Sequence, residues 1–168
     1  ENFALYKLGI SYILTMRGIP QIFYGTEILM SNPGTDDHGI IRSDFPGGWP
    51  GDDKNAFTGN GLEEKQLKAQ DFMQKLLNWR KQKEVIHTGE LMHFAPKNGV
   101  YVYFRYNKEE KVMVVLNKNN KEQNIDLSRF SEILSPHESG RDVISGKAYP
   151  LSNALKAPAM TPLILEIK

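Results

Sequence analysis

The stretch VYVYFRYNKEEKVMVVL, from Val100 to Leu116, carries the strongest structural signal in this chain of 168 residues. Two runs rich in β-branched and aromatic residues, Val100–Tyr106 and Val112–Leu116, flank the polar segment Asn107–Glu110. Runs of this composition favour strands, and a short polar loop between two of them predicts a β-hairpin. Further strand-like segments are Glu90–Phe94, Gln123–Leu127, Arg141–Ile144 and Leu163–Ile167. Short strands with no long helix between them predict an antiparallel β-sandwich.

The segment before the sandwich has a pattern typical of an α/β fold. Phe3–Met16 is apolar at nearly every position and predicts a buried helix. The apolar run Ile19–Tyr24, bounded by turn-forming residues, predicts a strand buried on both faces in a parallel sheet. A helix with one apolar face is predicted over about Asn60–Lys83. The chain therefore divides into an α/β part, residues 1–85, and an all-β part, residues 86–168.

The composition excludes several classes of partner and site. The formal net charge is only +1 and no basic run contains interleaved aromatic residues, so we expect neither nucleic acid nor a membrane as a partner. The absence of cysteine excludes disulfides, zinc–thiolate sites and thiol nucleophiles. The acid pairs Asp36-Asp37 and Asp52-Asp53 lack the spacing of a calcium loop, so we predict no metal site. The chain starts without a methionine or a signal peptide, and we expect it to be part of a longer protein.

The segment GIPQIFYGTE, Gly18–Glu27, resembles the eighth barrel strand of the α-amylase superfamily, glycoside hydrolase family 13. That strand commonly reads Gly-x-Pro-x-x-Tyr-Tyr-Gly-Asp-Glu, and this chain departs from it at Phe23 and Thr26. The loop segment Arg42–Asp52 and the helix segment Leu76–Lys81 are similar to the neopullulanase and cyclomaltodextrinase branch of the family.

This resemblance implies an architecture and an activity. Residues 1–85 are expected to be the last helix–strand–helix portion of a (β/α)8 TIM barrel, and residues 86–168 the C-terminal sandwich of the same enzyme. The family hydrolyses α-glucans such as starch, pullulan, maltooligosaccharides and cyclodextrins by a retaining mechanism, which needs two carboxylates about 5–5.5 Å apart. The family's catalytic carboxylates follow barrel strands that precede residue 1. We therefore expect no catalytic residue in this segment and no activity from it alone.

The resemblance implies substrate contacts on the long loop over residues 29–61, which is rich in turn-forming residues. Aromatic faces and forked polar groups suit the recognition of sugars. The candidate substrate-binding residues are Arg42, Asp37, Trp49 and Phe45, with His38 beside them. Arg42 matches a glucose-contacting arginine of the family, whereas Asp37 stands one residue further from it than the family's aspartate. In the alternative interpretation Arg42 pairs with a loop carboxylate and Trp49 packs the loop.

Three further expectations concern packing. Glu27 is an acid of the motif outside the catalytic three, and we expect it to bind backbone N–H groups of the following loop. The helix over Ala69–Trp79 is expected to pack on the strand Val100–Tyr106. The apolar run Ile19–Tyr24 would be unpaired in the isolated chain, which predicts self-association through residues 1–30.

A function of another class stays open from the sequence alone, namely a stand-alone carbohydrate-binding or interaction module. In such a module Tyr101, Tyr103 and Tyr106 would stack on sugars, whereas in the other interpretation they pack within the sheet. No cofactor is implied for this segment, and calcium stays open for a full-length enzyme. The resemblance leaves the localisation unsettled, with the periplasm or the extracellular space favoured over the cytoplasm.

Overall fold

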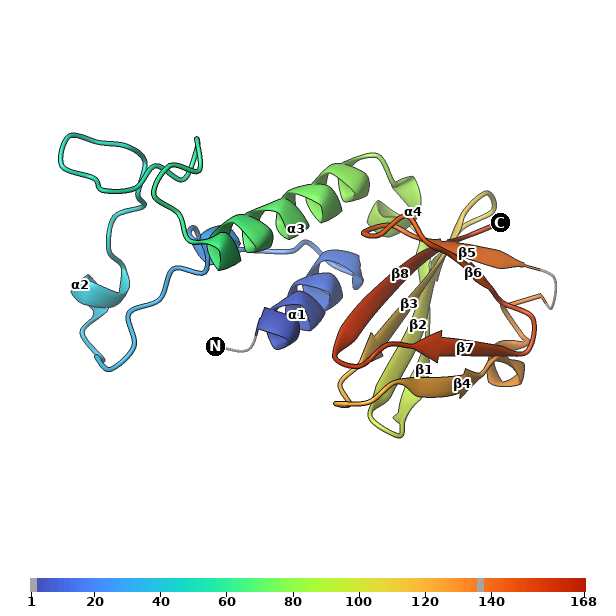
Figure 1. The fold of residues 1–168 in the computed structure, drawn as a ribbon. Coiled ribbons are helices and arrows are strands. Elements are labelled where there is room, and N and C mark those ends of the chain that lie inside the picture. Colours follow the sequence, from blue (N-terminus) through green and yellow to red (C-terminus); the bar gives the residue numbers. More distant parts are fainter. Residues whose placement is uncertain (1–2, 136–137) are drawn as a thin grey trace. The chain divides into compact units, whose positions relative to one another are not determined.

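The computed structural model describes residues 3–135 and 138–168 (Figure 1). The helices are α1 (Phe3–Thr15), η1 (Thr26–Ile28), α2 (His38–Ile41), α3 (Glu64–Lys81), α4 (Glu84–His87) and η2 (Leu127–Phe130). The strands are β1 (Glu90–Lys97), β2 (Val100–Tyr106), β3 (Lys111–Asn117), β4 (Gln123–Asp126), β5 (Ser139–Asp142), β6 (Ala148–Pro150), β7 (Ala154–Ala157) and β8 (Thr161–Ile167). No helix in the described ranges is long and apolar enough to cross a membrane.

The chain folds as two compact units. One unit consists of residues 1–20 and 75–168, and the other of residues 21–74. Helix α3 begins in the smaller unit and ends in the larger one. The division that we predict between residues 85 and 86 concerns domains of a longer protein, and it stays a prediction.

The larger unit is built on two antiparallel sheets. Six strands form one sheet in the order β1-β2-β3-β8-β5-β6, while β4 pairs with β7 in a separate two-stranded sheet (Figure 1). The two sheets share one core, in which Leu155 and Ala157 of β7 pack with side chains of the six-stranded sheet. These sheet side chains alternate along their strands because successive side chains point to opposite faces. The core side chains of the central strands are Val100, Val102, Phe104, Met113, Val115, Leu163 and Leu165. This arrangement confirms the prediction of an antiparallel β-sandwich-like fold.

The central hairpin agrees closely with its prediction. Strands β2 and β3 pair from Val100 opposite Asn117 to Tyr106 opposite Lys111, which leaves the loop Asn107–Glu110 between them. The side-chain Oδ1 of Asn107 accepts hydrogen bonds from the backbone N–H groups of Glu109 at 2.9 Å and Glu110 at 2.7 Å. An asparagine that binds backbone two and three residues onward is typical of a tight turn.

The other face of the six-stranded sheet is covered by helix α1. This helix contacts β3 and β8, and the sheet side chains Val112, Val114 and Ile164 are at most 1% exposed although they lie outside the sandwich core. The Tyr12 ring lies 6.4 Å from the rings of both Tyr101 and Tyr103. The central strands are therefore buried on both faces, which explains their nearly continuous apolar runs.

This packing decides between two expectations for the tyrosines of β2. Helix α1 covers this face of the sheet, and Trp79 of α3 donates a hydrogen bond to Glu166 of β8 at 2.8 Å. The packing of the helix Ala69–Trp79 on Val100–Tyr106 stays a prediction. Tyr103 is fully buried and its hydroxyl lies 2.6 Å from Thr15 Oγ1. The Tyr106 hydroxyl donates to Glu90 at 3.0 Å. The tyrosines of β2 thus serve packing in and around the sheet.

The predicted strand Ile19–Tyr24 is wrong for this structure. The backbone over residues 19–23 is irregular, Tyr24 lies in a turn, and Ile19 is 98% exposed. A single strand is unstable because its backbone N–H and C=O groups need neighbouring strands as partners. Within the described residues no strand lies beside this run to supply those partners.

One polar cluster joins the end of α3 to the sheet. Lys83 Nζ lies 2.8 Å from Glu166 Oε1 and 2.9 Å from Glu110 Oε1, and Trp79 donates to the same Glu166 oxygen. Burial raises the pKa of Glu166, but the hydrogen bonds from Lys83 and Trp79 and the Lys83 charge lower it more, so that pKa ends below its ordinary value of 4.5. The folded state therefore favours the ionised carboxylate.

This cluster predicts an acid-dependent contribution to stability. Because the folded pKa lies below the unfolded one, the contribution is present above the ordinary pKa and is lost as the pH falls through the folded pKa. At neutral pH we expect Glu166→Gln to lower the free energy of unfolding by about 0.5–1 kcal/mol, as for a partly exposed ion pair. Urea unfolding near pH 2 should give the same stability for variant and parent, and a difference of equal size at both pH values would contradict this account.

Candidate functional site

The loop of the smaller unit is shaped by carboxylate and amide side chains that bind nearby backbone. Asp37 Oδ1 accepts from the N–H groups of Gly39 at 2.7 Å and Ile40 at 3.4 Å, which starts the short helix α2. Asp52 Oδ2 accepts from the N–H groups of Gly48 at 3.0 Å and Trp49 at 2.9 Å. Since these turns follow one another, the loop presents its remaining side chains at defined positions.

The candidate substrate-binding residues all lie on this loop. Arg42 follows α2 and is exposed, and Trp49 is 70% exposed. The half-buried Phe45 packs its ring against Phe57, with ring centroids 5.6 Å apart. Asp37 is exposed and uses Oδ1 for the backbone.

The alternative roles of these side chains are not seen in the described residues. There the guanidinium of Arg42 has no hydrogen bond or ion pair with a loop carboxylate. Trp49 exposes most of its surface instead of packing the loop. In the described part of the chain, no hydrogen bond or ion pair joins Arg42, Asp37 and Trp49 to one another. Arg42 and Trp49 are therefore available to a ligand.

The expected role of Glu27 is corrected by the structure. Glu27 lies half-buried in η1, and its carboxylate binds no backbone N–H group among the described residues. A backbone hydrogen bond closes a turn around Glu27, in which the Met30 N–H donates to the Gly25 carbonyl at 2.9 Å. Other side chains fasten the segment: Gln66 of α3 donates to the Ile28 carbonyl at 2.9 Å, and the Tyr24 hydroxyl donates to the Ser43 carbonyl at 3.1 Å.

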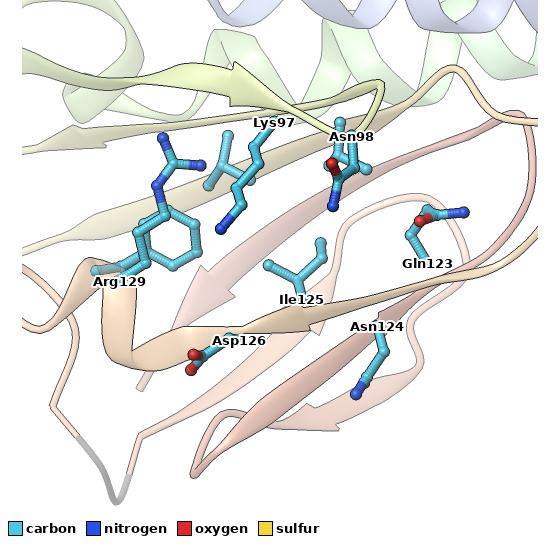
Figure 2. A pocket seen from close by; sticks show the side chains of 10 residues that line it. Lys97, Asn98, Gln123, Asn124, Ile125, Asp126 and Arg129 are labelled. Atoms are coloured by element: carbon cyan, nitrogen blue, oxygen red, sulfur yellow. The ribbon is translucent and has the colours of Figure 1, made fainter.

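A second candidate site lies on the sandwich and was not predicted from the sequence. It is a pocket of about 210 Å³ between the β1–β2 turn, strand β4 and helix η2 (Figure 2). Its lining residues are Lys97, Asn98, Val100, Val102, Gln123, Asn124, Ile125, Asp126, Arg129 and Phe130. The turn residues Asn98-Gly99, between two strand-like runs, are the signal that could have revealed the hairpin at its rim. In the described ranges no group of three or more His, Asp or Glu side chains could hold a metal ion.

The sandwich is similar to a known protein family. Residues 91–166 match the family model described as the cyclo-malto-dextrinase C-terminal domain. Among solved structures, the α-amylase of Geobacillus thermoleovorans in complex with acarbose is 20% identical and superposes with a TM-score of 0.76, covering 99% of this chain and 33% of its own.

Two other structures agree. AmyP in complex with maltose is 16% identical with a TM-score of 0.79, covering 98% of this chain and 34% of its own. The trehalulose synthase MutB of Pseudomonas mesoacidophila MX-45 is 19% identical with a TM-score of 0.68, covering 98% of this chain and 38% of its own. The chain thus spans about a third of the length of these proteins. At this level of identity the structures show a shared fold.

Proposed function

We propose that this chain is the C-terminal portion of a neopullulanase- or cyclomaltodextrinase-like glycoside hydrolase that cleaves α-glucans with retention of configuration. The observation that carries the proposal is the match of residues 91–166 to the cyclo-malto-dextrinase C-terminal domain. The proteins of similar fold include an α-amylase in complex with acarbose and AmyP in complex with maltose. Both are sugar ligands, which agrees with an α-glucan as the substrate.

In this proposal residues 1–85 complete a (β/α)8 barrel. The run Ile19–Tyr24 becomes its eighth strand once neighbouring strands supply partners for the backbone N–H and C=O groups. Without those neighbours the run is irregular, as it is in this structure. The exposed apolar side chains Ile19 and Phe23 would then favour self-association of the isolated chain. The catalytic carboxylates would come from the part of the enzyme before residue 1.

The loop of the smaller unit would contribute substrate contacts beside the scissile bond. The free guanidinium of Arg42 can donate in a forked geometry to two hydroxyl groups of one sugar. The exposed indole of Trp49 offers an apolar face to a sugar ring, and the Oδ2 atom of Asp37 can accept from a hydroxyl. No cofactor is needed in this segment, and calcium would act only elsewhere in the complete enzyme.

An assay of the complete enzyme beside this chain tests the proposal. The complete enzyme should release reducing sugar from pullulan, cyclodextrins or maltooligosaccharides, and the first product should keep the α configuration. The chain alone should release none, because acceleration requires a nucleophile and an acid held across the sugar. A complete enzyme that is inactive on all these substrates would overturn the proposal. Turnover by the chain alone that disappears on Glu27→Gln would overturn the non-catalytic role of Glu27.

Arg42 gives a sharper prediction in the complete enzyme. We expect Arg42→Ala to raise KM for maltooligosaccharides roughly tenfold, since hydrogen bonds from a charged donor are worth about 1.5–3 kcal/mol. We expect kcat to change by less than about twofold, because such a contact holds substrate and transition state alike. Lys108→Ala removes one exposed positive charge on the β2–β3 loop and serves as the control with unchanged KM. A fall in kcat at constant KM would show that Arg42 acts in the chemical step instead.

A further inference from the structure

The pocket on the sandwich has an apolar floor and a polar rim. We call the apolar lining residues Val100, Val102, Ile125 and Phe130 its floor. We call the amide and charged lining side chains, which Figure 2 labels, its rim. Its volume of about 210 Å³ is below the roughly 300–1,000 Å³ of sites that enclose a drug-sized ligand. The pocket is therefore suited to a single ring.

The upper rim is held in place by the fold. Asn98 and Gly99 have φ values of 51° and 71°, the left-handed backbone of a two-residue hairpin turn that joins β1 to β2. Asn119 Nδ2 donates to the Asn98 carbonyl at 2.7 Å, and the Lys118 N–H donates to the Gly99 carbonyl at 3.1 Å. Figure 2 shows the side chains of Lys97 and Asn98 reaching from this turn toward Ile125 of β4. A ligand would not have to order the backbone of this rim, which lowers the entropic cost of binding.

The opposite rim is also fastened. Arg129 Nη2 donates to the Ala95 carbonyl at 2.6 Å, and the guanidinium lies about 6 Å from the rings of Phe94 and Phe130. Asp126 accepts from the Ser128 N–H at 2.9 Å at the start of η2. Hydrogen bonds from Ser128 and the nearby Lys97 ammonium hold the pKa of Asp126 below its ordinary value. Asp126 therefore stays an acceptor down to acid pH.

The mixture of groups on the rim selects the chemistry of the ligand. An anion would be drawn to Lys97 and Arg129 but would meet the Asp126 carboxylate, and a cation would meet both positive charges. A neutral apolar ring would leave the rim amides without partners. Sugar hydroxyls donate and accept at once, and the C–H groups of the ring suit an apolar floor. The rim and floor together therefore favour a neutral polyhydroxylated ring.

We propose that this pocket binds one glucose unit of an α-glucan. Lys97 and Asn98 would donate hydrogen bonds to hydroxyl oxygens from one side. Gln123 of β4 would both donate to and accept from sugar hydroxyls, and the ring would lie on Ile125 and Val102. The choice of an α-glucan among polyhydroxylated ligands rests on the proposed function.

Two glutamines provide a matched pair of variants. Gln123 is half-buried on β4 and lines the pocket, whereas Gln82 is exposed just after α3 and does not line it. A tryptophan at position 123 would fill the pocket, while Gln82→Trp makes the same chemical change outside it.

The test is a titration of the full, 15N-labelled chain with maltotriose, with cellotriose and inorganic phosphate as separate arms. We expect shifts of the amide signals of β4 and the β1–β2 turn, with a Kd on the order of 1 mM. Gln123→Trp should raise that Kd at least about tenfold, and Gln82→Trp should leave it within about twofold. If Gln123→Trp does not fold, Lys97→Met against Lys108→Met repeats the comparison, with weakening expected only for Lys97→Met.

Each other outcome counts against the pocket. No shift with maltotriose, shifts confined to other regions, equal weakening by both variants, equal binding of cellotriose, or phosphate binding in place of maltotriose would overturn the proposal. Hydrolysis by the complete enzyme is measured separately. If the complete enzyme is inactive but maltotriose still binds here, the proposed function is refuted and the sugar-binding pocket is not. If the enzyme is active but maltotriose does not bind here, only the sugar-binding pocket is refuted.

Discussion

Replacing Arg105 with methionine should lower the free energy of unfolding by about 3–5 kcal/mol. Arg105 is only 1% exposed, and its guanidinium donates to three backbone carbonyls. The acceptors are Thr15 at 3.1 Å, Gly89 at 2.8 Å and Glu90 at 3.2 Å. Methionine keeps much of the apolar stem but has no donor, so these buried carbonyls would lose their partners.

The position of Arg105 explains why its loss should be so costly. One acceptor lies at the end of α1 and the other two lie at the start of β1, so a single side chain joins the covering helix to the edge strand. Burial and the charge of Arg80 lower the pKa of Arg105. The guanidinium nonetheless stays charged at neutral pH, since arginine titrates far above it.

Urea unfolding of the full chain measures the effect of this variant. Arg141→Met is the matched control, because Arg141 is exposed on β5 and makes one hydrogen bond, to the Gly146 carbonyl at 3.3 Å. That control should change stability by less than about 0.5 kcal/mol. Arg105→Lys should fall between the two, since one ammonium cannot reach all three carbonyls. Parental stability for Arg105→Met would show that water replaces the lost donors.

Asn117→Asp should be the second most damaging change, at about 3 kcal/mol near neutral pH. The fully buried Asn117 donates from Nδ2 to the carbonyls of Lys121 at 3.1 Å, Ala157 at 3.0 Å and Pro158 at 2.9 Å. Its Oδ1 atom accepts from the N–H and the Nδ2 of Asn119, both at 2.9 Å. An aspartate would turn an acceptor oxygen toward carbonyl oxygens and bury a charge among them.

The same substitution predicts a particular pH dependence. Carbonyl oxygens around a buried carboxyl raise its folded pKa above the unfolded value, so the favourable protonated form is retained below the unfolded pKa and lost as the pH rises. The penalty should therefore shrink below about pH 4. Asn120→Asp makes the same chemical change at an exposed position three residues away, and it should cost little at any pH. A penalty for Asn117→Asp that does not vary with pH would contradict this account.

Local patterns predicted the elements whose stability depends on local sequence. The strands around Asn107–Glu110 and the helix α1 were within a residue or two of their predicted ends because composition, turn residues and burial all agree there. The next helix was predicted from Asn60 but begins at Glu64, since Asn60 is used in a turn whose carbonyl accepts from the Asn55 N–H. Gln66 then accepts from the Glu63 N–H and starts the helix.

Elements that depend on distant partners could not be predicted in the same way. Strand β7 reads Ala-Leu-Lys-Ala, a weak strand former, and it exists because it pairs with β4 and buries Leu155 and Ala157. The run Ile19–Tyr24 shows the converse, since a strongly apolar run without neighbours forms no strand. The sandwich pocket is likewise assembled from β1, β2, β4 and η2, so no single stretch of sequence contains its pattern.

The larger compact unit is interrupted in the chain, and this has a consequence for synthesis on the ribosome. Helix α1 is made before the strands it packs on, β3 and β8, which end at Asn117 and Ile167. At about 5–20 residues per second, completing β8 takes on the order of 10–30 s after α1 has emerged. During this time the apolar face of the helix has no sheet to cover it and is available to a chaperone or to another nascent chain. Strand β8 also supplies Leu163 and Leu165 to the core and Ile164 to the helix face, so both layers close when this strand pairs with the sheet.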